Sequence, residues 1–185
     1  MKSSLIISDL DGTLIDTQAA NLAAYKKAAD ALNISVSDEK YISCFGLNFN
    51  DMCDAIGIPV KVRSEYKRLK KEFYPSCFNL AKPNYILIDE LKKAKAEGTK
   101  IALGTTASKP NVINILTHFG LLDLFDYILA GEDVSKGKPD PEVYLKIMAH
   151  FVIEPQDTII YEDSEVGLAA AEDAGAVVIK VEKWN

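Results

Sequence analysis

Short apolar runs followed by helical segments are the feature that most restricts how this chain can fold. Five such runs, rich in Ile, Val and Leu, occupy residues 3–9, 101–105, 127–131, 158–163 and 176–181. The segments after the later runs have helical periodicity and carry capping residues at their ends: Ser108, Asp140 and Ser164 before them, and Gly98, Gly120 and Gly175 at their C-terminal ends. Continuous apolar strands alternating with helices indicate a parallel sheet covered on both faces. The sequence therefore predicts a doubly wound α/β fold.

One long stretch interrupts this alternation. Between Thr17 and Lys82 we find no apolar run typical of a buried strand. Two segments with helical periodicity, residues 17–32 and 62–74, lie on either side of a stretch rich in Gly and Asn. We therefore predict a core made of residues 1–16 and 83–185, with residues 17–82 inserted after the first strand as a small helical domain.

Composition and charge exclude several classes of protein. A chain of 185 residues has room for roughly one domain with a modest insertion. Its net charge of −6 argues against a nucleic-acid-binding surface. The longest stretch without charged residues has 13 residues, whereas a spanning helix needs about 20. An acid also interrupts any secretory apolar segment at the start, so we expect a cytoplasmic protein without membrane or nucleic-acid partners.

Acidic, hydroxyl and amine side chains follow four of the predicted strands. In chain order they are Asp9 and Asp11, Thr105 and Thr106, Lys138, and Glu162 and Asp163. Ligands of open α/β sheets bind beyond the carboxyl ends of the strands, so these side chains are expected to meet there. Two carboxylates about 4 Å apart repel by roughly 4 kcal/mol at an effective dielectric near 20. A cation is therefore required, and Mg²⁺, which prefers oxygen ligands, fits together with the lysine.

This combination predicts a particular chemistry. Next to a divalent ion, a carboxylate can attack phosphorus and hold it as an aspartyl phosphate. A second carboxyl two residues further on can protonate the leaving oxygen and later activate water. Each residue alone has a plainer interpretation, since acids near turns are usually caps and a Lys-Pro pair usually lies on the surface. Their occurrence at successive strand ends favours a catalytic site.

The same residues resemble the four motifs of the haloacid dehalogenase superfamily. The matching segments are Asp9-Leu10-Asp11-Gly12-Thr13-Leu14, the Thr105 of IALGTTAS, the Lys138 of GKPDPEVY, and Glu162-Asp163-Ser164. The resemblance points to the group that includes phosphoglycolate phosphatases and β-phosphoglucomutase. It implies a sheet of strand order 5-4-1-2-3 and identifies the helical insertion as a cap that selects the substrate.

The resemblance also implies a role for each site residue. Asp9 is the expected nucleophile, Asp11 the general acid and base, and Thr105 a hydrogen-bond donor to the phosphoryl group. Lys138 neutralises the nucleophile and the phosphate, and phosphate binding is assigned to Thr105, Thr106 and Lys138. The expected Mg²⁺ ligands are Asp9, the backbone carbonyl of Asp11, and Asp163, with Glu162 included in the acidic set.

Three functions remain open, and we rank a phosphatase first. The second acid, Asp11, favours phosphoryl transfer over carbon–halogen cleavage, so we predict a Mg²⁺-dependent phosphatase of a small phosphorylated metabolite. A sugar phosphomutase is the first alternative, but such enzymes usually carry a histidine at the position of Asn21. A non-enzymatic receiver module that stores a phospho-aspartate is the second, with Asp133 near its expected acceptor position. The Asp-x-Asp-Gly-Thr turn and the long helical insertion argue against it.

Overall fold

The computed structural model describes residues 3–44 and 49–184. By its internal contacts the chain divides into two units: a sheet unit, Met1–Asp16 with Lys82–Asn185, and a helical unit, Thr17–Ala81. Among the described residues, no helix has both the length and the apolar character needed to cross a membrane.

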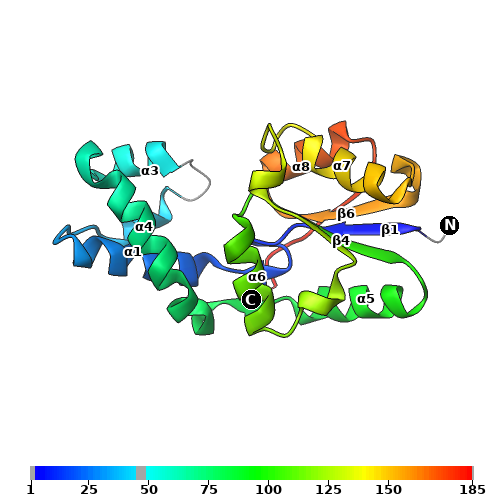
Figure 1. The fold of residues 1–185 in the computed structure, drawn as a ribbon, viewed down its shortest axis with the longest axis horizontal. Helices are drawn as coiled ribbons and strands as arrows, with labels where there is room; N and C mark the ends of the chain where they lie inside the picture. Colours follow the sequence, from blue (N-terminus) through cyan, green and yellow to red (C-terminus); the bar gives the residue numbers. More distant parts are fainter. Residues whose placement is uncertain (1–2, 45–48, 185) are drawn as a thin grey trace. The chain divides into compact units, whose positions relative to one another are not determined.

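The sheet unit is built on five parallel strands (Figure 1). Their order across the sheet is β5-β4-β1-β6-β7, which is the predicted 5-4-1-2-3 order counted from the other edge. β1 lies in the centre, between β4 and β6, with Ser8 opposite Leu103 and Tyr161. The strands are β1 (Leu5–Ser8), β4 (Lys100–Gly104), β5 (Tyr127–Leu129), β6 (Thr158–Glu162) and β7 (Val177–Lys180). The predicted doubly wound α/β fold is confirmed.

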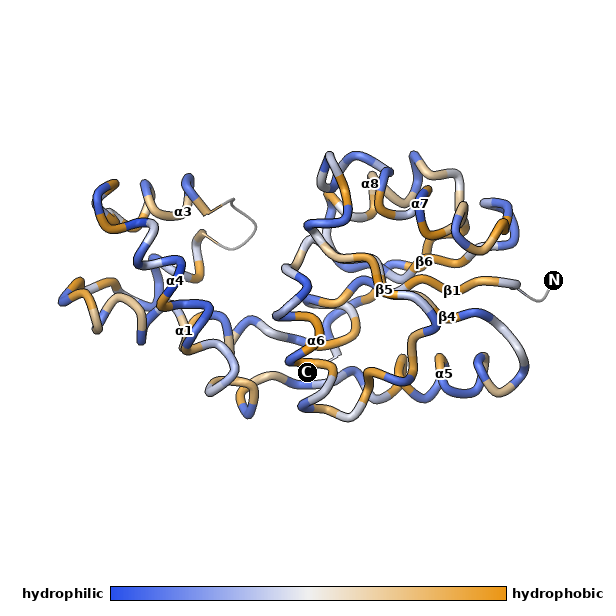
Figure 2. The backbone as a smooth tube through the Cα atoms, viewed as in Figure 1, coloured by the Kyte–Doolittle hydropathy of each residue, from blue (hydrophilic) through white to orange (hydrophobic). Residues whose placement is uncertain are grey.

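Four helices cover the two faces of this sheet, α5 and α6 on one and α7 and α8 on the other (Figure 1). Their bounds are α5 (Tyr85–Ala96), α6 (Lys109–His118), α7 (Glu142–Phe151) and α8 (Glu165–Asp173). Leu5 and Ile7 of β1 pack against α7 and α8 in a core that includes Tyr144 and Ile147. Hydrophobic residues accordingly follow the strands in Figure 2. Because successive side chains of a strand point to opposite faces, a continuously apolar β1 is buried on both sides.

Short elements connect these parts of the sheet unit. β2 (Ile15–Asp16) pairs with β3 (Lys82–Pro83) in antiparallel fashion, so the chain leaves and re-enters the sheet unit at adjacent positions. The 3-10 turns are η3 (Leu122–Leu124), η4 (Gly131–Asp133) and η5 (Pro155–Asp157). Gly98, Gly120 and Gly175 follow helices with positive φ, as expected for helix ends.

The helical unit has its own hydrophobic core, which includes Tyr41, Cys53, Ile56 and Tyr66. Its elements are α1 (Gln18–Ala31), α2 (Asp38–Ile42), α3 (Phe49–Ile56), η1 (Val60–Val62), α4 (Arg63–Phe73) and η2 (Tyr74–Leu80). The two helices predicted from periodicity correspond to α1 and α4. The sequence did not predict α2 and α3, because they are short and lie next to Gly and Asn residues that are typical of turns. The three cysteines of the chain are unpaired and buried.

Candidate active site

Asp9 stands at the carboxyl end of the central strand. Its backbone N–H donates to the carbonyl of Tyr161 over 3.0 Å, which extends the ladder between β1 and β6 by one residue. The hydroxyl of Ser8 donates to the carbonyl of Asp9 over 2.7 Å. Asp9 is buried, with 6% of its surface exposed. These hydrogen bonds therefore fix the Asp9 backbone at the end of β1.

Lys138 holds this carboxylate from the loop before α7. Its Nζ lies 2.7 Å from Asp9 Oδ1 and 2.5 Å from Glu162 Oε1, and 5.0 Å from the centre of the Tyr144 ring. Its side chain is 96% buried, since only 4% remains exposed. Burial alone would lower the pKa of Lys138, but the Asp9 carboxylate and then Tyr144 and Glu162 raise it above its ordinary value. The two neighbouring carboxylates therefore favour the charged ammonium form of Lys138.

The Glu162 carboxylate is fully engaged within the protein. Oε1 accepts hydrogen bonds from Lys138 and, over 3.2 Å, from the Tyr144 hydroxyl. Oε2 accepts from the backbone N–H and the hydroxyl of Ser164, at 2.9 and 3.0 Å. A Cβ atom placed on Gly167 would overlap this carboxylate, so the absence of a side chain there leaves room for it. With four donors to its two oxygens, Glu162 is suited to orienting Lys138.

Asp163 lies beside this pair but has a different partner. Its Oδ1 accepts a hydrogen bond from the Thr13 hydroxyl over 2.7 Å. A Cβ atom on Gly12, whose φ is +94°, would overlap the Asp163 carboxylate. Burial raises the pKa of Asp163 above its ordinary value, although the Thr13 hydrogen bond acts in the opposite direction.

The three acids form a group with the chemistry of a divalent-cation site. One carboxylate oxygen from each of Asp9, Glu162 and Asp163 lies within 4.8 Å of the others, and this is a candidate metal cluster among the described residues. The pKa of Asp9 is raised to about 7, mainly by burial; Lys138 acts to lower it, and the charges of Glu162 and Asp11 act to raise it. Desolvated carboxylates with raised pKa values gain from a bound cation, and oxygen donors are those that Mg²⁺ prefers. The residues present therefore fit Mg²⁺.

The remaining predicted residues lie around this group. Asp11 is exposed and close enough to raise the pKa of Asp9 through its charge. Thr105 is buried directly after β4, and its Oγ1 accepts from the Ala107 N–H over 3.1 Å, which leaves the hydroxyl proton to be donated. Thr106 is exposed. Contacts of 2.5–2.7 Å thus join Lys138 to Asp9 and Glu162, whereas the two threonines share with them only the location at the strand ends.

Two residues of the site were not given a role from sequence. Tyr144 is fully buried and donates to Glu162, but its spacing with Ile147 and Met148 is that of an ordinary core face. A buried tyrosine needs a partner for its hydroxyl, which is the signal that could have identified it. Thr13 belongs to the Asp9–Leu14 motif, but the sequence assigned no function to its side chain. Asp133, the acceptor expected for a receiver module, instead accepts from the Ala130 N–H over 2.9 Å at the start of η4.

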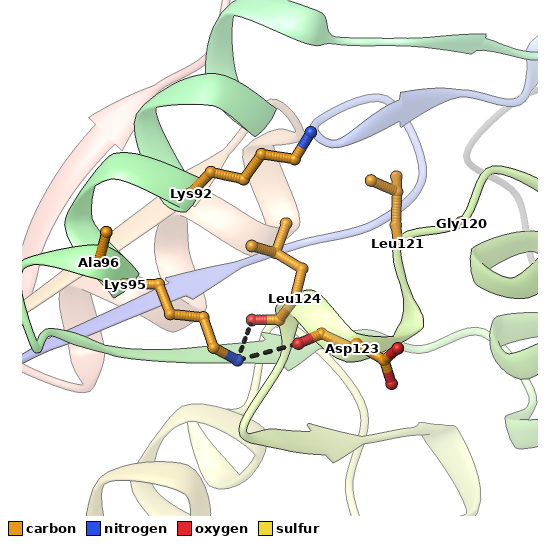
Figure 3. Close-up of a pocket in the computed structure, with 7 residues that line it drawn as sticks. All are labelled: Lys92, Lys95, Ala96, Gly120, Leu121, Asp123 and Leu124. Carbon is orange, nitrogen blue, oxygen red and sulfur yellow. Dashed lines mark hydrogen bonds between the residues drawn. The ribbon is translucent and has the colours of Figure 1, made fainter.

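A separate cavity of about 370 Å³ lies at the C-terminal ends of α5 and α6 (Figure 3). Its lining includes Lys92, Lys95 and Leu124. Lys95 donates to the backbone carbonyls of Asp123 and Leu124 over 3.0 and 2.8 Å and pairs with Asp126 over 3.1 Å. These residues precede β4 and β5, so the cavity is at the opposite end of the strands from Asp9. The Lys95 ammonium thus uses its donors on these three groups of the protein itself.

The fold and the strand-end group of acids and lysine are those expected of a hydrolase family, and comparison with known families agrees. Residues 6–181 match the model of the haloacid dehalogenase-like hydrolases, and the chain belongs to this family. The predicted resemblance is confirmed by this match. The prediction of a phosphoric monoester hydrolase is confirmed at the level of the family, whose matched members include named phosphatases.

Individual relatives cover nearly the whole chain. A phosphorylated carbohydrates phosphatase of Thermotoga maritima is 28% identical, over 92% of this chain and 81% of the relative. A β-phosphoglucomutase of Bacillus subtilis is 26% identical, over 95% of this chain and 82% of the relative. The crystal structure of CbbY from Rhodobacter sphaeroides in complex with phosphate superimposes with a TM-score of 0.86 at 25% identity, over 98% of this chain and 87% of that one.

Proposed function

We propose that this protein is a Mg²⁺-dependent phosphatase that hydrolyses a small phosphorylated metabolite through a phospho-Asp9 intermediate. The observation that carries the proposal is the Lys138 ammonium, buried between Asp9 and Glu162 at the end of the central strand. It holds one oxygen of Asp9 in place. The family match and a relative named as a phosphatase of phosphorylated carbohydrates support the same reaction.

The first half of the reaction forms the acyl phosphate. A carboxylate oxygen of Asp9 attacks phosphorus, and the bond between phosphorus and the substrate oxygen breaks. Asp11, in its protonated form, gives its proton to that leaving oxygen, so an alcohol departs. Negative charge on the phosphoryl oxygens is offset by the Lys138 ammonium and by hydrogen bonds from the hydroxyls of Thr105 and Thr106.

The second half releases phosphate and restores the enzyme. Asp11, now a carboxylate, takes a proton from water as the water oxygen attacks phosphorus of the acyl phosphate. The bond between phosphorus and the Asp9 oxygen breaks, and inorganic phosphate leaves. Asp9 returns to its carboxylate form, held again by Lys138.

Mg²⁺ would be held by the carboxylates of Asp9 and Asp163 and the backbone carbonyl of Asp11, with Glu162 adjacent. When bound, it supplies charge neutralisation and polarisation of a phosphoryl oxygen. In this proposal the helical unit selects the substrate, and the residues that react belong to the sheet unit. The proposed setting is the cytoplasm.

Phosphate release tests the proposal directly. We expect the wild-type protein to release phosphate from a panel of phosphorylated metabolites with Mg²⁺, and EDTA or Asp9→Asn to abolish turnover. Asp11→Asn should still react once with p-nitrophenyl phosphate, whose leaving group needs no acid, and give a burst of one nitrophenolate per protein. Persistence of steady turnover in Asp9→Asn would exclude the phospho-Asp9 route.

The phosphomutase alternative has one observation in its favour, the similarity to a β-phosphoglucomutase. Against it, Asn21 occupies the position where a mutase usually has histidine, and its amide donates to the Thr17 hydroxyl over 3.1 Å and to the Tyr74 hydroxyl over 3.4 Å. A side-chain amide does not titrate near neutral pH, so Asn21 cannot act as a general acid or base. Incubation with a sugar phosphate separates the two functions, since a mutase gives an isomer and a phosphatase gives free phosphate.

A further inference from the structure

The Asp163 carboxylate is oriented by a neutral donor. Thr13 is fully buried, and its hydroxyl donates to Asp163 Oδ1 over 2.7 Å. This hydrogen bond restricts rotation of the carboxylate without cancelling its charge. Lys138, in contrast, neutralises the charge of Asp9 and Glu162. Of the three acids in the group, Asp163 is therefore the one whose negative charge stays most available to a cation.

Thr13 is itself held from the start of α5. The side-chain amide of Asn84 donates to the Thr13 carbonyl over 3.2 Å, and the Asn84 backbone N–H donates to the Leu14 carbonyl over 2.9 Å. Asn84 is 5% exposed. Its side-chain oxygen accepts from the Leu87 N–H over 3.2 Å, which caps α5. The oxygen of the buried Asn84 amide therefore caps α5, and its nitrogen fixes the loop that carries Thr13.

The position of Asn84 in the chain links this network to the junction between the two units. It follows β3 directly, and β3 pairs with β2, so Asn84 stands where the chain re-enters the sheet unit. A continuous hydrogen-bonded path runs from this junction through Asn84 and Thr13 to Asp163.

We propose that Thr13 and Asn84 are positioning residues that orient the Asp163 carboxylate toward the bound cation. The inference deepens the proposed metal-dependent function and rests on it. A ligand whose orientation is fixed beforehand loses less freedom when the ion binds. Removal of the hydrogen-bonding partner of a metal ligand typically lowers metal affinity by about 10- to 100-fold.

The test measures Mn²⁺ binding to the metal-free protein by isothermal titration calorimetry, with Mn²⁺ as a probe for the Mg²⁺ site. Thr13→Val keeps the shape of the side chain but removes the donor, and we expect its Mn²⁺ affinity to fall by about tenfold or more. Thr13→Ser restores the hydroxyl and should recover most of that affinity. In activity assays, Thr13→Val should raise the Mg²⁺ concentration for half-maximal rate more than it lowers kcat. Circular dichroism and thermal unfolding check that each variant is folded.

Asn84 is tested by a substitution that separates its two roles. Asn84→Ser retains a residue that caps helices well but is too short to reach the Thr13 carbonyl. We expect a weaker Mn²⁺ affinity, by about threefold to tenfold. The matched control is Ser37→Asn, the reverse exchange at the cap of α2 in the helical unit, where Ser37 accepts from the Lys40 N–H. That variant should bind Mn²⁺ as the wild type does.

Asp163→Asn distinguishes failure of this inference from failure of the proposed function. If Asp163→Asn binds Mn²⁺ as the wild type does, the proposed cation site is wrong. If Asp163→Asn loses binding while folded Thr13→Val retains wild-type affinity, only the positioning role is overturned. Should Thr13→Val fail to fold, wild-type Mn²⁺ affinity in Asn84→Ser overturns the proposal instead.

Discussion

At the scale of single residues, two glycines shape the site because they have no side chain. Gly12 and Gly167 carry no reactive atom, yet each leaves the space that a carboxylate occupies, that of Asp163 and that of Glu162. The acids are thus packed against backbone without side chains. This packing explains why glycine is required at these two positions independently of any turn.

Gly12→Ala should disable the enzyme more than its backbone strain explains. Its Cβ would overlap the Asp163 carboxylate, and its φ of +94° is unfavourable for alanine. Gly98→Ala is the matched control, since Gly98 has φ +93° and open space around a Cβ. We expect both variants to lose about 1 kcal/mol of stability from strain, and Gly12→Ala alone to lose at least 100-fold in phosphatase activity. Equal activity in the two variants would contradict this account.

Lys138→Met should destabilise the protein as well as inactivate it. Removing the ammonium leaves the buried carboxylates of Asp9 and Glu162 without compensation, which typically costs about 3–5 kcal/mol. Lys136→Met in the same loop removes an exposed ion pair with Asp140 and should change stability by about 0.5 kcal/mol or less. Denaturant unfolding in EDTA compares the two. A loss in Lys138→Met no larger than in Lys136→Met would show that the ion pairs contribute little.

The sequence pointed to the residues that we propose to react, but not to the residues that support them. The spacing of Asp9 and Asp11, and the strand-end positions of Lys138 and Asp163, follow from local patterns and the strand order. The contacts of Tyr144 and Asn84 connect positions 18 and 71 residues apart, and no local pattern encodes them. Such partners become visible only when the packing is known.

At the scale of elements, the loop before α7 delivers Lys138, and Glu142 fixes that loop. The Glu142 carboxylate accepts from the Ser135 N–H and hydroxyl, at 2.9 and 2.6 Å, and from the Lys136 N–H at 2.8 Å. Lys146, one turn along α7, pairs with it over 2.6 Å. The first turn of α7 therefore binds the loop that carries Lys138.

Glu142→Gln should loosen this loop and lower kcat by about tenfold, because an amide oxygen replaces two charged acceptors. The hydrogen bond from Lys146, followed by those from Ser135, lowers the pKa of Glu142 below its ordinary value of 4.5. A carboxyl whose pKa is lower in the folded than in the unfolded protein stabilises the fold at pH values above its unfolded pKa. This stabilisation is lost progressively as the pH falls below about 4.5. Thermal unfolding between about pH 6 and pH 3 should therefore depend less steeply on pH in Glu142→Gln.

Lys146→Met is the control for this prediction. It removes the ion pair with Glu142 and the hydrogen bond to the Asp133 carbonyl, but it leaves the hydrogen bonds from Ser135 and Lys136 to Glu142. We expect it to keep most of the activity. A kcat as low as that of Glu142→Gln would assign the effect to the contacts of Lys146 rather than to the hydrogen bonds from Ser135 and Lys136.

Periodicity predicted the long elements of the fold and missed the shortest ones. The five strands and four covering helices of the sheet unit follow from apolar runs and capping residues. The pairing of β2 with β3 joins two-residue segments more than 60 positions apart, one of which contains Pro83. Neither length nor composition marks such a pair as a strand.

At the scale of the whole molecule, the two units have separate hydrophobic cores. Asp16 is paired with Lys82, so the sheet unit closes on itself where the helical unit is inserted. For the sheet unit, the inserted residues are the equivalent of a long loop.

Replacing Thr17–Ala81 with Asn-Gly should therefore give a protein that folds. The two residues join Asp16 to Lys82 as a tight hairpin between antiparallel partners. We expect a cooperative unfolding transition and Mn²⁺ affinity close to that of the full chain, since Asp9, Asp163 and Lys138 all belong to the sheet unit. Selectivity among phosphorylated substrates should be lost. A shortened chain without cooperative unfolding would show that the sheet unit depends on the insertion for its stability.

The central place of β1 has a dynamic consequence. Its amides and carbonyls are bonded to a neighbour on each side, so Asp9, which directly follows β1, can shift only if two ladders open together. β5 and β7 are bonded on one side alone, and thermal fraying begins at such margins. Thermal opening of the sheet is therefore expected first at its edges, away from the central strand that carries Asp9.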